Sequence, residues 1–265
     1  MGVFMKVIDL TPEYEKLYFV CLEDWSSEMQ EAGEHKAIWY EKMKDKGLKV
    51  MLAKDDDGVI CGMIQYVPIA HSFAKGEDLY IVLCIWVHGH KQGIGDYRKR
   101  GIGKALLTAA EQDVMAIGAK GLAAWGMIIP VFMQAAWFKK QGYKVVDKSG
   151  IMALLLKSFS IDAKPPTIIK QKRKLEKIKG QVTVYAFKYG WCPVSNLAYE
   201  RAKRACLALG DKVVFKEYDT MDEQIFAQWG IRDGLFVDNK EIRTGPPPSY
   251  EKIYQVIEKK AKKLK

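Results

Sequence analysis

The stretch Arg98-Lys99-Arg100-Gly101-Ile102-Gly103-Lys104 carries the residues best suited to hold a phosphorylated ligand. Apolar residues at helical spacing follow it, so it opens an amphipathic helix. Amide N–H groups in the first turn of a helix have no partners within the helix, and the macrodipole adds about half a positive charge there. Such a turn binds a pyrophosphate well. Glycine at positions 101 and 103 removes side chains that would hold the phosphate away, so we predict a diphosphate site here.

The spacing of these glycines separates the stretch from two other phosphate-binding turns. The Walker sequence Gly-x-x-x-x-Gly-Lys-Ser/Thr is absent from it. A dinucleotide-binding turn needs a third glycine at a set distance after Gly103, and the chain has none there. Neither a nucleoside-triphosphate loop nor a dinucleotide fold is therefore indicated.

Four segments together resemble the GNAT acetyltransferases. Arg98-x-x-Gly101-x-Gly103 matches the family's Arg/Gln-x-x-Gly-x-Gly/Ala signature, and residues 137–143 look like its Leu-Tyr-Glu-Lys-x-Gly-Phe segment. The apolar run 79–87 looks like the family's fourth strand, and 59–68 looks like its third. The resemblance covers residues 3–157 in the family's order. It implies the GNAT mixed-sheet α/β fold of acyl-CoA N-acyltransferases, with acetyl-CoA as co-substrate.

The resemblance also implies how acetyl-CoA is held and what reaction follows. In the family the cofactor lies where two central strands splay apart, and a neutral primary amine attacks the thioester carbonyl directly. Backbone groups of Ile85, Trp86 and Val87 would hold the pantetheine arm. The residues implied around the pyrophosphate are Arg98, Arg100, Gly101, Ile102, Gly103, Lys104 and Ala105.

The catalytic groups are harder to assign. The position that often holds a tyrosine acid in the family aligns with Phe138, which cannot donate a proton. Tyr143 is either its replacement or a core residue. A base for the amine is expected in the Gly-rich stretch 88–97, where His88 or His90 is either that base or a surface side chain. Two histidines in a Gly-rich stretch do not by themselves make a metal site, so we expect no metal.

A second candidate site lies at Trp191-Cys192-Pro193. A predicted strand, 182–187, precedes it, and Pro193 suits the first turn of a helix. A thiolate at a helix N-terminus is stabilised by the dipole and by unpaired N–H groups. The arrangement resembles the thioredoxin-like (YoaP-like) domains that follow some bacterial GNAT domains. Ser195 stands where a resolving cysteine would be, so cycling between a dithiol and a disulfide is not expected.

The order of predicted elements supports two domains. Strands and helices up to residue 157 follow the order β-α-α-β-β-β-α-β-α-β-β, and those after 181 follow β-α-β-α-β-β-α. The Pro165-Pro166 pair and a basic run lie between them. We therefore predict a GNAT domain at 1–160, a basic linker at 161–180 and a smaller thioredoxin-like α/β domain at 181–265.

The amino-acid composition indicates which classes of partner the protein is expected to have. The 265 residues carry a net charge of +10, concentrated in the linker and in the C-terminal tail. Neither run has interleaved aromatic residues, so nucleic acid is not the expected partner. The N-terminus lacks an apolar run, and no apolar stretch is long enough for a bilayer, so we expect a cytoplasmic protein without a membrane partner.

The predicted enzyme is an N-acetyltransferase acting on the amine of a small molecule, or of a protein or peptide, with a homodimer left open. The alternative is a CoA-binding or thiol-reactive regulatory protein that uses Cys192 and transfers little acetyl.

Overall fold

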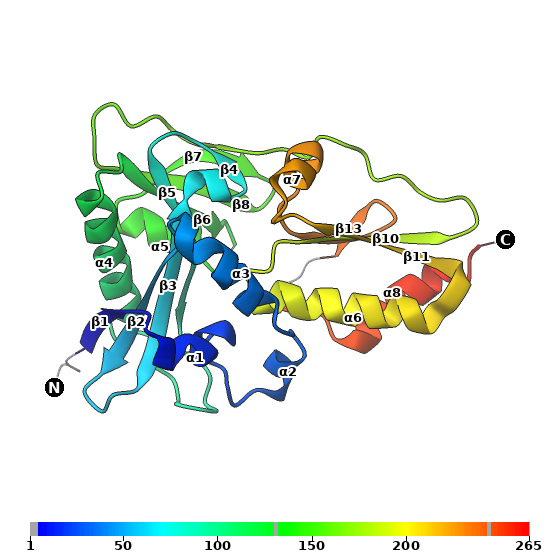
Figure 1. The fold of residues 1–265 in the computed structure, drawn as a ribbon, viewed down its shortest axis with the longest axis horizontal. Coiled ribbons are helices and arrows are strands. Elements are labelled where there is room, and N and C mark those ends of the chain that lie inside the picture. Colours follow the sequence, from blue (N-terminus) through cyan, green and yellow to red (C-terminus); the bar gives the residue numbers. More distant parts are fainter. Residues whose placement is uncertain (1–4, 130–131, 243–244, 265) are drawn as a thin grey trace. The chain divides into compact units, whose positions relative to one another are not determined.

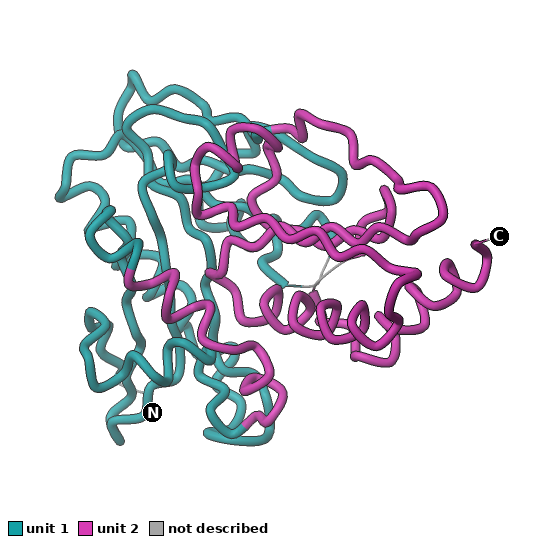
Figure 2. Tube along the Cα trace, turned by 45° about the vertical axis from the view of Figure 1, so that its right-hand side comes forward, with its two compact units in different colours: residues 1–25, 42–169 teal, residues 26–41, 170–265 magenta. Residues whose placement is uncertain are grey.

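The computed structural model describes residues 5–129, 132–242 and 245–264, and its elements are labelled in Figure 1. The chain forms two compact units, which are coloured separately in Figure 2. Unit 1 comprises residues 1–25 and 42–169, and unit 2 comprises 26–41 and 170–265. The chain therefore enters unit 2 briefly before it completes unit 1.

A seven-stranded sheet forms the centre of unit 1, in the order β1-β2-β3-β5-β6-β8-β7. All neighbouring strands are antiparallel except β5 and β6, which are parallel. The strands are β1 (Met5–Asp9), β2 (Lys49–Asp55), β3 (Ile60–Pro68), β5 (Leu79–Val87), β6 (Gly121–Met127), β7 (Lys144–Ser149) and β8 (Met152–Ser158). The order of these seven strands along the chain agrees with the predicted order.

Helices α4 (Ile102–Ala116) and α5 (Ala135–Lys140) pack on one face of this sheet and bury a shared core. Gly62 on β3 permits the close approach of α4, since a Cβ there would lie 2.8 Å from Ile102 Cγ2. On the other face, Tyr18 of α1 (Glu15–Phe19) donates a 2.7 Å hydrogen bond to Gln65 of β3. A short pair, β4 (Ala74–Lys75) with β9 (Thr167–Ile168), completes unit 1.

Unit 2 is built on a four-stranded sheet in the order β11-β10-β12-β13. Strands β10 and β11 are parallel, and β12 and β13 are antiparallel to their neighbours. Apolar residues of α6 and α8 form a core with one sheet face, and Trp229 at the end of α7 packs with Tyr185 and Phe187 of β10 on the other. The elements are β10 (Val182–Lys188), α6 (Pro193–Leu209), β11 (Val213–Asp219), α7 (Glu223–Trp229), β12 (Gly234–Val237), β13 (Lys240–Ile242) and α8 (Tyr250–Ala261).

The segment between Ser27 and Lys46 differs from the single helical region that its sequence indicates. It forms α2 (Ser27–Gln30), α3 (His35–Met43) and a 3-10 turn, and Gly33 adopts a φ of +66° between the two helices. Its first part belongs to unit 2, because Glu28 and Glu31 pair with Arg201 of α6. Such ion pairs between distant positions leave no mark on a local sequence pattern.

The basic segment 161–180 is also more structured than a solvated linker. β9 pairs with β4 of unit 1, whereas Leu175 is buried in the core of unit 2. The Tyr185 hydroxyl accepts from the Glu176 amide at 3.1 Å and donates to the Glu176 carbonyl at 2.8 Å. Among the described residues, no helix combines the length and the apolar character needed to cross a bilayer.

Candidate functional site

The parallel strands β5 and β6 of unit 1 separate part of the way along their length. Their register runs from Leu79–Gly121 to Val82–Ala124, yet β5 continues to Val87. On its other edge β5 stays paired with β3, with a bulge at Leu83. Beyond the bulge, the β5 edge that faces β6 carries backbone groups that no residue of β6 pairs. Ile85, Trp86 and Val87, the residues predicted to hold the pantetheine arm, all lie on this open part.

Trp125 bridges the point where the two strands part. Its indole Nε1–H donates a 2.8 Å hydrogen bond to the carbonyl of Leu83, directly at the bulge. The bond joins β6 to β5 one residue beyond the last paired position on each strand. The sequence does not mark Trp125 for this role, because its pairing with Leu83 depends on the register between β5 and β6.

The N-terminus of helix α4 lies beside the open end of β5. A Cβ placed on Gly103 would be 3.9 Å from Val87 Cγ2 and 3.5 Å from the Trp137 ring, so it would fit. Gly101 is the N-cap residue with a φ of +83°, and it has no side chain to cap the helix. Glycine adopts this left-handed conformation without steric cost. The helix therefore begins with its first amides uncapped by a side chain.

The amides of the first turn are not equivalent. The Ala105 N–H donates to the Gly101 carbonyl at 3.0 Å, as a helical hydrogen bond requires. The Ala105 amide is therefore already engaged within the helix, and the prediction that Ala105 lies around the pyrophosphate does not depend on this amide as a donor. The amides of Ile102, Gly103 and Lys104 are the donors that a helix start leaves without intrahelical partners.

The predicted basic residues around this turn have different partners. Arg98 is engaged with Asp96 through contacts of 2.9 Å and 2.6 Å, and the hydrogen bond from Arg98 holds the pKa of Asp96 well below its ordinary value. Arg100 lies over the Tyr97 ring at 4.5 Å and donates to the Asp96 carbonyl. Lys104, on the first turn of α4, is exposed. Lys104 therefore lies on the same turn of α4 as these amides. The side chains of Arg98 and Arg100 instead contact Asp96 of the preceding loop.

His88 is not positioned to act as the predicted base. It is fully buried, and its Nδ1 lies 2.7 Å from the Gly95 carbonyl, which can only accept a hydrogen bond. Nδ1 must therefore carry the proton, and Nε2 accepts from Trp25 Nε1–H at 3.0 Å. Both ring nitrogens are occupied, so His88 holds the loop 88–97 in place and has no lone pair for an amine proton.

Tyr143 does not take the place of the missing acid either. Its side chain is buried in the core of unit 1, where the ring packs against Phe138 at 5.5 Å. Burial, followed by the nearby Glu111 carboxylate, raises the pKa of Tyr143 far above its ordinary value. The alternative reading of Tyr143 as a core residue agrees with this position.

Cys192 of unit 2 occupies the position that the sequence predicts. It is the N-cap residue of α6, with Pro193 following at the start of the helix, and its side chain is partly exposed. None of the five cysteines, all of which the structure describes, forms a disulfide. Burial raises the pKa of Cys206 to about 12 and that of Cys61 to about 11, so these two thiols stay protonated. No group of three or more metal-ligating side chains occurs in the described ranges.

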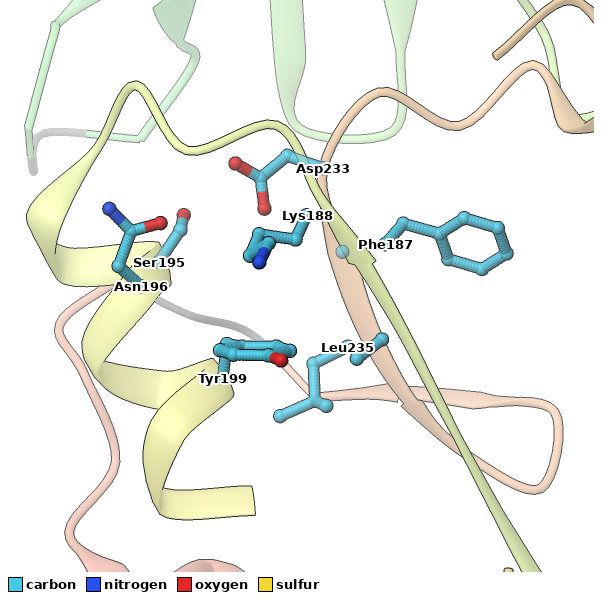
Figure 3. Close-up of a pocket in the computed structure, with 9 residues that line it drawn as sticks. Phe187, Lys188, Ser195, Asn196, Tyr199, Asp233 and Leu235 are labelled. Atoms are coloured by element: carbon cyan, nitrogen blue, oxygen red, sulfur yellow. The ribbon is translucent and has the colours of Figure 1, made fainter. Parts of the chain in front are cut away.

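A small pocket of unit 2 lies between the first turns of α6 and the end of β10 (Figure 3). Its volume of about 10 Å³ is enough for one water molecule. Lys188, Ser195 and Tyr199 line it together with Asp233, whose buried Oδ2 accepts no hydrogen bond from any residue that the structure describes. Burial raises the pKa of Asp233 to about 7. No local sequence signal marks this carboxyl, because its burial depends on long-range packing.

Unit 2 is expected to lose stability as the pH rises from about 4 to about 7. Asp233 releases its proton near its ordinary value of 3.8 in the unfolded chain and near 7 when folded, so the unfolded state binds fewer protons across this interval. Asp233→Asn should remove that slope and raise the melting temperature at pH 8 by at least about 4 °C, the effect of ~1 kcal/mol in a small domain. Thermal unfolding at pH 4 and pH 8 measures both effects, and an equal shift at the two pH values would contradict the assignment.

Comparisons with known proteins point to one family. The model described as the Acetyltransferase (GNAT) family matches residues 9–143. No curated protein matches the chain.

Solved structures that match include three acetyltransferases. A GNAT family acetyltransferase from Brucella melitensis, in complex with acetyl-CoA, has a TM-score of 0.40 and 16% identity over 61% of this chain and 92% of its own. The PaiA N-acetyltransferase from Thermoplasma acidophilum, in complex with coenzyme A, has a TM-score of 0.44 and 17% identity over 59% and 99%. The YhbS protein from Escherichia coli, in complex with CoA, has a TM-score of 0.45 and 11% identity over 63% and 91%.

Proposed function

Since the chain belongs to the acetyltransferase (GNAT) family, we propose that unit 1 moves the acetyl group of acetyl-CoA to a primary amine by direct attack. One observation carries the proposal: the open edge of β5 beyond Val82 and the uncapped N-terminus of α4 lie side by side, with Val87 next to Gly103. A strand edge with unpaired backbone groups suits the amide-rich pantetheine arm. A helix N-terminus suits the diphosphate at its other end.

The reaction follows from these two contacts. The neutral amine nitrogen attacks the thioester carbonyl carbon, a C–N bond forms, and the C–S bond breaks with its electron pair on sulfur. A backbone N–H on the open part of β5 would stabilise the negative charge that develops on the carbonyl oxygen. The amine proton must pass to a base, and the thiolate takes a proton from solvent.

Acetyl-CoA is expected to stabilise the protein against heat. A ligand at 100 times its dissociation constant adds about 2.7 kcal/mol to the stability of the state that binds it. Thermal unfolding with acetyl-CoA, with CoA and with adenosine alone measures this effect. We expect a rise with the first two, and the absence of a rise with acetyl-CoA would contradict the proposed function.

For unit 2, we propose a thioredoxin-like domain spanning 181–265. Its support is the sheet order β11-β10-β12-β13, the single parallel pair and the helix that starts at Cys192–Pro193. The partly exposed Cys192 favours the second candidate function, a thiol-reactive regulatory role with little acetyl transfer. Alkylation of Cys192 at pH 6, compared with Cys206 as the buried reference thiol, tests it: reaction no faster than that of Cys206 would remove this candidate.

A further inference from the structure

Five rings of unit 1 gather where β5 and β6 part. The Trp86 ring lies 6.0 Å from His90 and 6.0 Å from Phe132, and Phe132 lies 6.1 Å from Trp125. Trp25 adds a contact of 5.4 Å to His90. We call these five residues the aromatic cluster. Trp86 is on the open part of β5 and Trp125 is on β6, so the cluster lies beside the position proposed for the thioester.

Much of this cluster faces solvent. Phe132 is 41% exposed, the His90 side chain is 41% exposed and Trp25 is 37% exposed. Ile128 and Ile129, which follow β6, are exposed as well. Single exposed apolar residues are ordinary, but neighbouring exposed rings at one place mark a binding surface. Rings at such distances offer stacking faces and edges, so they suit a ligand with a flat apolar body.

His90 differs from His88 in its hydrogen bonding. His90 Nε2 lies 3.3 Å from Glu23 Oε1, and among the described residues none bonds its Nδ1. A carboxylate beside Nε2 stabilises the imidazolium that forms when Nδ1 takes a proton. Among the described residues, the titratable groups in contact with His90 are Glu23 and His88, and the two ring nitrogens of His88 are hydrogen-bonded to Gly95 and Trp25. His90 therefore has the exposure, the free nitrogen and the carboxylate partner that a base needs.

We propose that His90, paired with Glu23, takes the proton from the attacking amine, and that the aromatic cluster binds an acceptor whose amine is carried on an aromatic body. The inference rests on the proposed function and names its base and its acceptor class. As the C–N bond forms and the C–S bond breaks, the nitrogen's proton moves to His90 Nδ1 and then to solvent, and the sulfur leaves as a thiolate. A polycationic acceptor is not favoured, since Glu23 is the one carboxylate that contacts a ring of the cluster within the described chain, and it is largely buried.

The test uses the full chain with 2-phenylethylamine and spermidine as acceptors at saturating acetyl-CoA. We expect 2-phenylethylamine to have a kcat/KM at least about tenfold higher than spermidine, which is ~1.4 kcal/mol of selectivity. Phe132→Ala should raise the KM for 2-phenylethylamine several-fold with little change in kcat. A preference for spermidine, or no acetylation of 2-phenylethylamine, would overturn the aromatic acceptor.

The base is tested by the pH dependence of kcat, which reports groups in the complex rather than the free amine. His90→Gln should lower kcat by about 10²- to 10⁴-fold and remove the fall at acidic pH. Glu23→Gln should lower kcat less than His90→Gln does, since the base remains and only its carboxylate partner is lost. His35→Gln is the matched control: it removes another His–Glu pair, with Glu200 of unit 2 at 2.6 Å, and should leave the profile unchanged.

Thermal stabilisation by acetyl-CoA is measured for every variant to separate the two proposals. It should be the same in wild type, His90→Gln and Glu23→Gln, because neither His90 nor Glu23 is among the groups proposed to hold the cofactor. An unchanged kcat profile in His90→Gln, with normal acetyl-CoA binding, would overturn the assignment of the base alone. Absence of acetyl-CoA binding in the wild type would overturn the proposed function itself.

Discussion

Gly103→Asp is expected to abolish acetyl-CoA binding while unit 1 stays folded. The new carboxylate would sit in the first turn of α4, among the amides proposed to hold the diphosphate. Two like charges about 4 Å apart repel by ~4 kcal/mol at a protein surface, and solvent lowers that figure, so we expect at least about a 100-fold loss of affinity. Isothermal titration with acetyl-CoA measures it.

The fold should tolerate this substitution. A Cβ at Gly103 meets Trp137 at 3.5 Å, an ordinary contact distance, and an acidic residue near a helix N-terminus is stabilising by ~0.3–1 kcal/mol. Gly103→Ala is the matched control, because it adds the Cβ, keeps the amide and adds no charge. It should bind acetyl-CoA within about tenfold of wild type, a change below ~1.4 kcal/mol. Equal affinity in Gly103→Asp and Gly103→Ala would show that the diphosphate lies elsewhere.

The double substitution Glu28→Ala/Glu31→Ala is expected to destabilise unit 2 by about 2–3 kcal/mol. The Arg201 side chain is 4% exposed and reaches Glu28 at 2.6 Å, Glu31 at 3.2 Å and the Pro248 carbonyl at 3.0 Å. Removing both carboxylates leaves a buried guanidinium with one neutral acceptor. This loss of stability is smaller than is usual on breaking a buried ion pair, because Glu28 is more than half exposed and solvent screens its charge. Hydrogen exchange of the α6 amides measures the loss.

The matched control for this prediction is Arg201→Met, which removes the buried charge together with its need for partners. It should cost at least about 1 kcal/mol less than the double substitution. The stabilisation of unit 2 by the Arg201–Glu31 pair should also depend on pH. The hydrogen bond from Arg201 holds the pKa of Glu31 below its ordinary 4.5, so the stabilisation is present above that pH and is lost as the pH falls through the lowered value. An Arg201→Met variant that is as unstable as the double substitution would contradict this account.

Two parts of the candidate site could be predicted because their signals are local. A glycine at position 101, followed by apolar residues at helical spacing, is enough to predict where α4 starts, and in the structure Gly101 adopts the left-handed conformation that glycine allows. In the same way, Cys192 becomes the N-cap of α6 because Pro193 suits the first helical turn. Backbone conformation and side-chain period act over a few residues, so they are visible in the sequence before any tertiary contact is known.

The choice between the two neighbouring histidines required the tertiary structure. His88 and His90 have the same chemistry and lie two positions apart, yet one is sealed by Trp25 and Gly95 and the other faces Glu23. Trp25 and Glu23 are more than 60 positions from these histidines. Nothing in the local pattern around position 90 indicates such partners.

By itself, then, the sequence determined the order of the seven strands of the unit 1 sheet along the chain, the start of α4 and the family resemblance, because each depends on near neighbours in the chain. The tertiary structure decided where β5 leaves β6, which of the two histidines pairs with Glu23, and that residues 26–41 pack with unit 2. It also decided that Asp233 is a buried carboxyl with a raised pKa. These features arise from strand register, burial and ion pairing between distant segments, and they exist only in the folded protein.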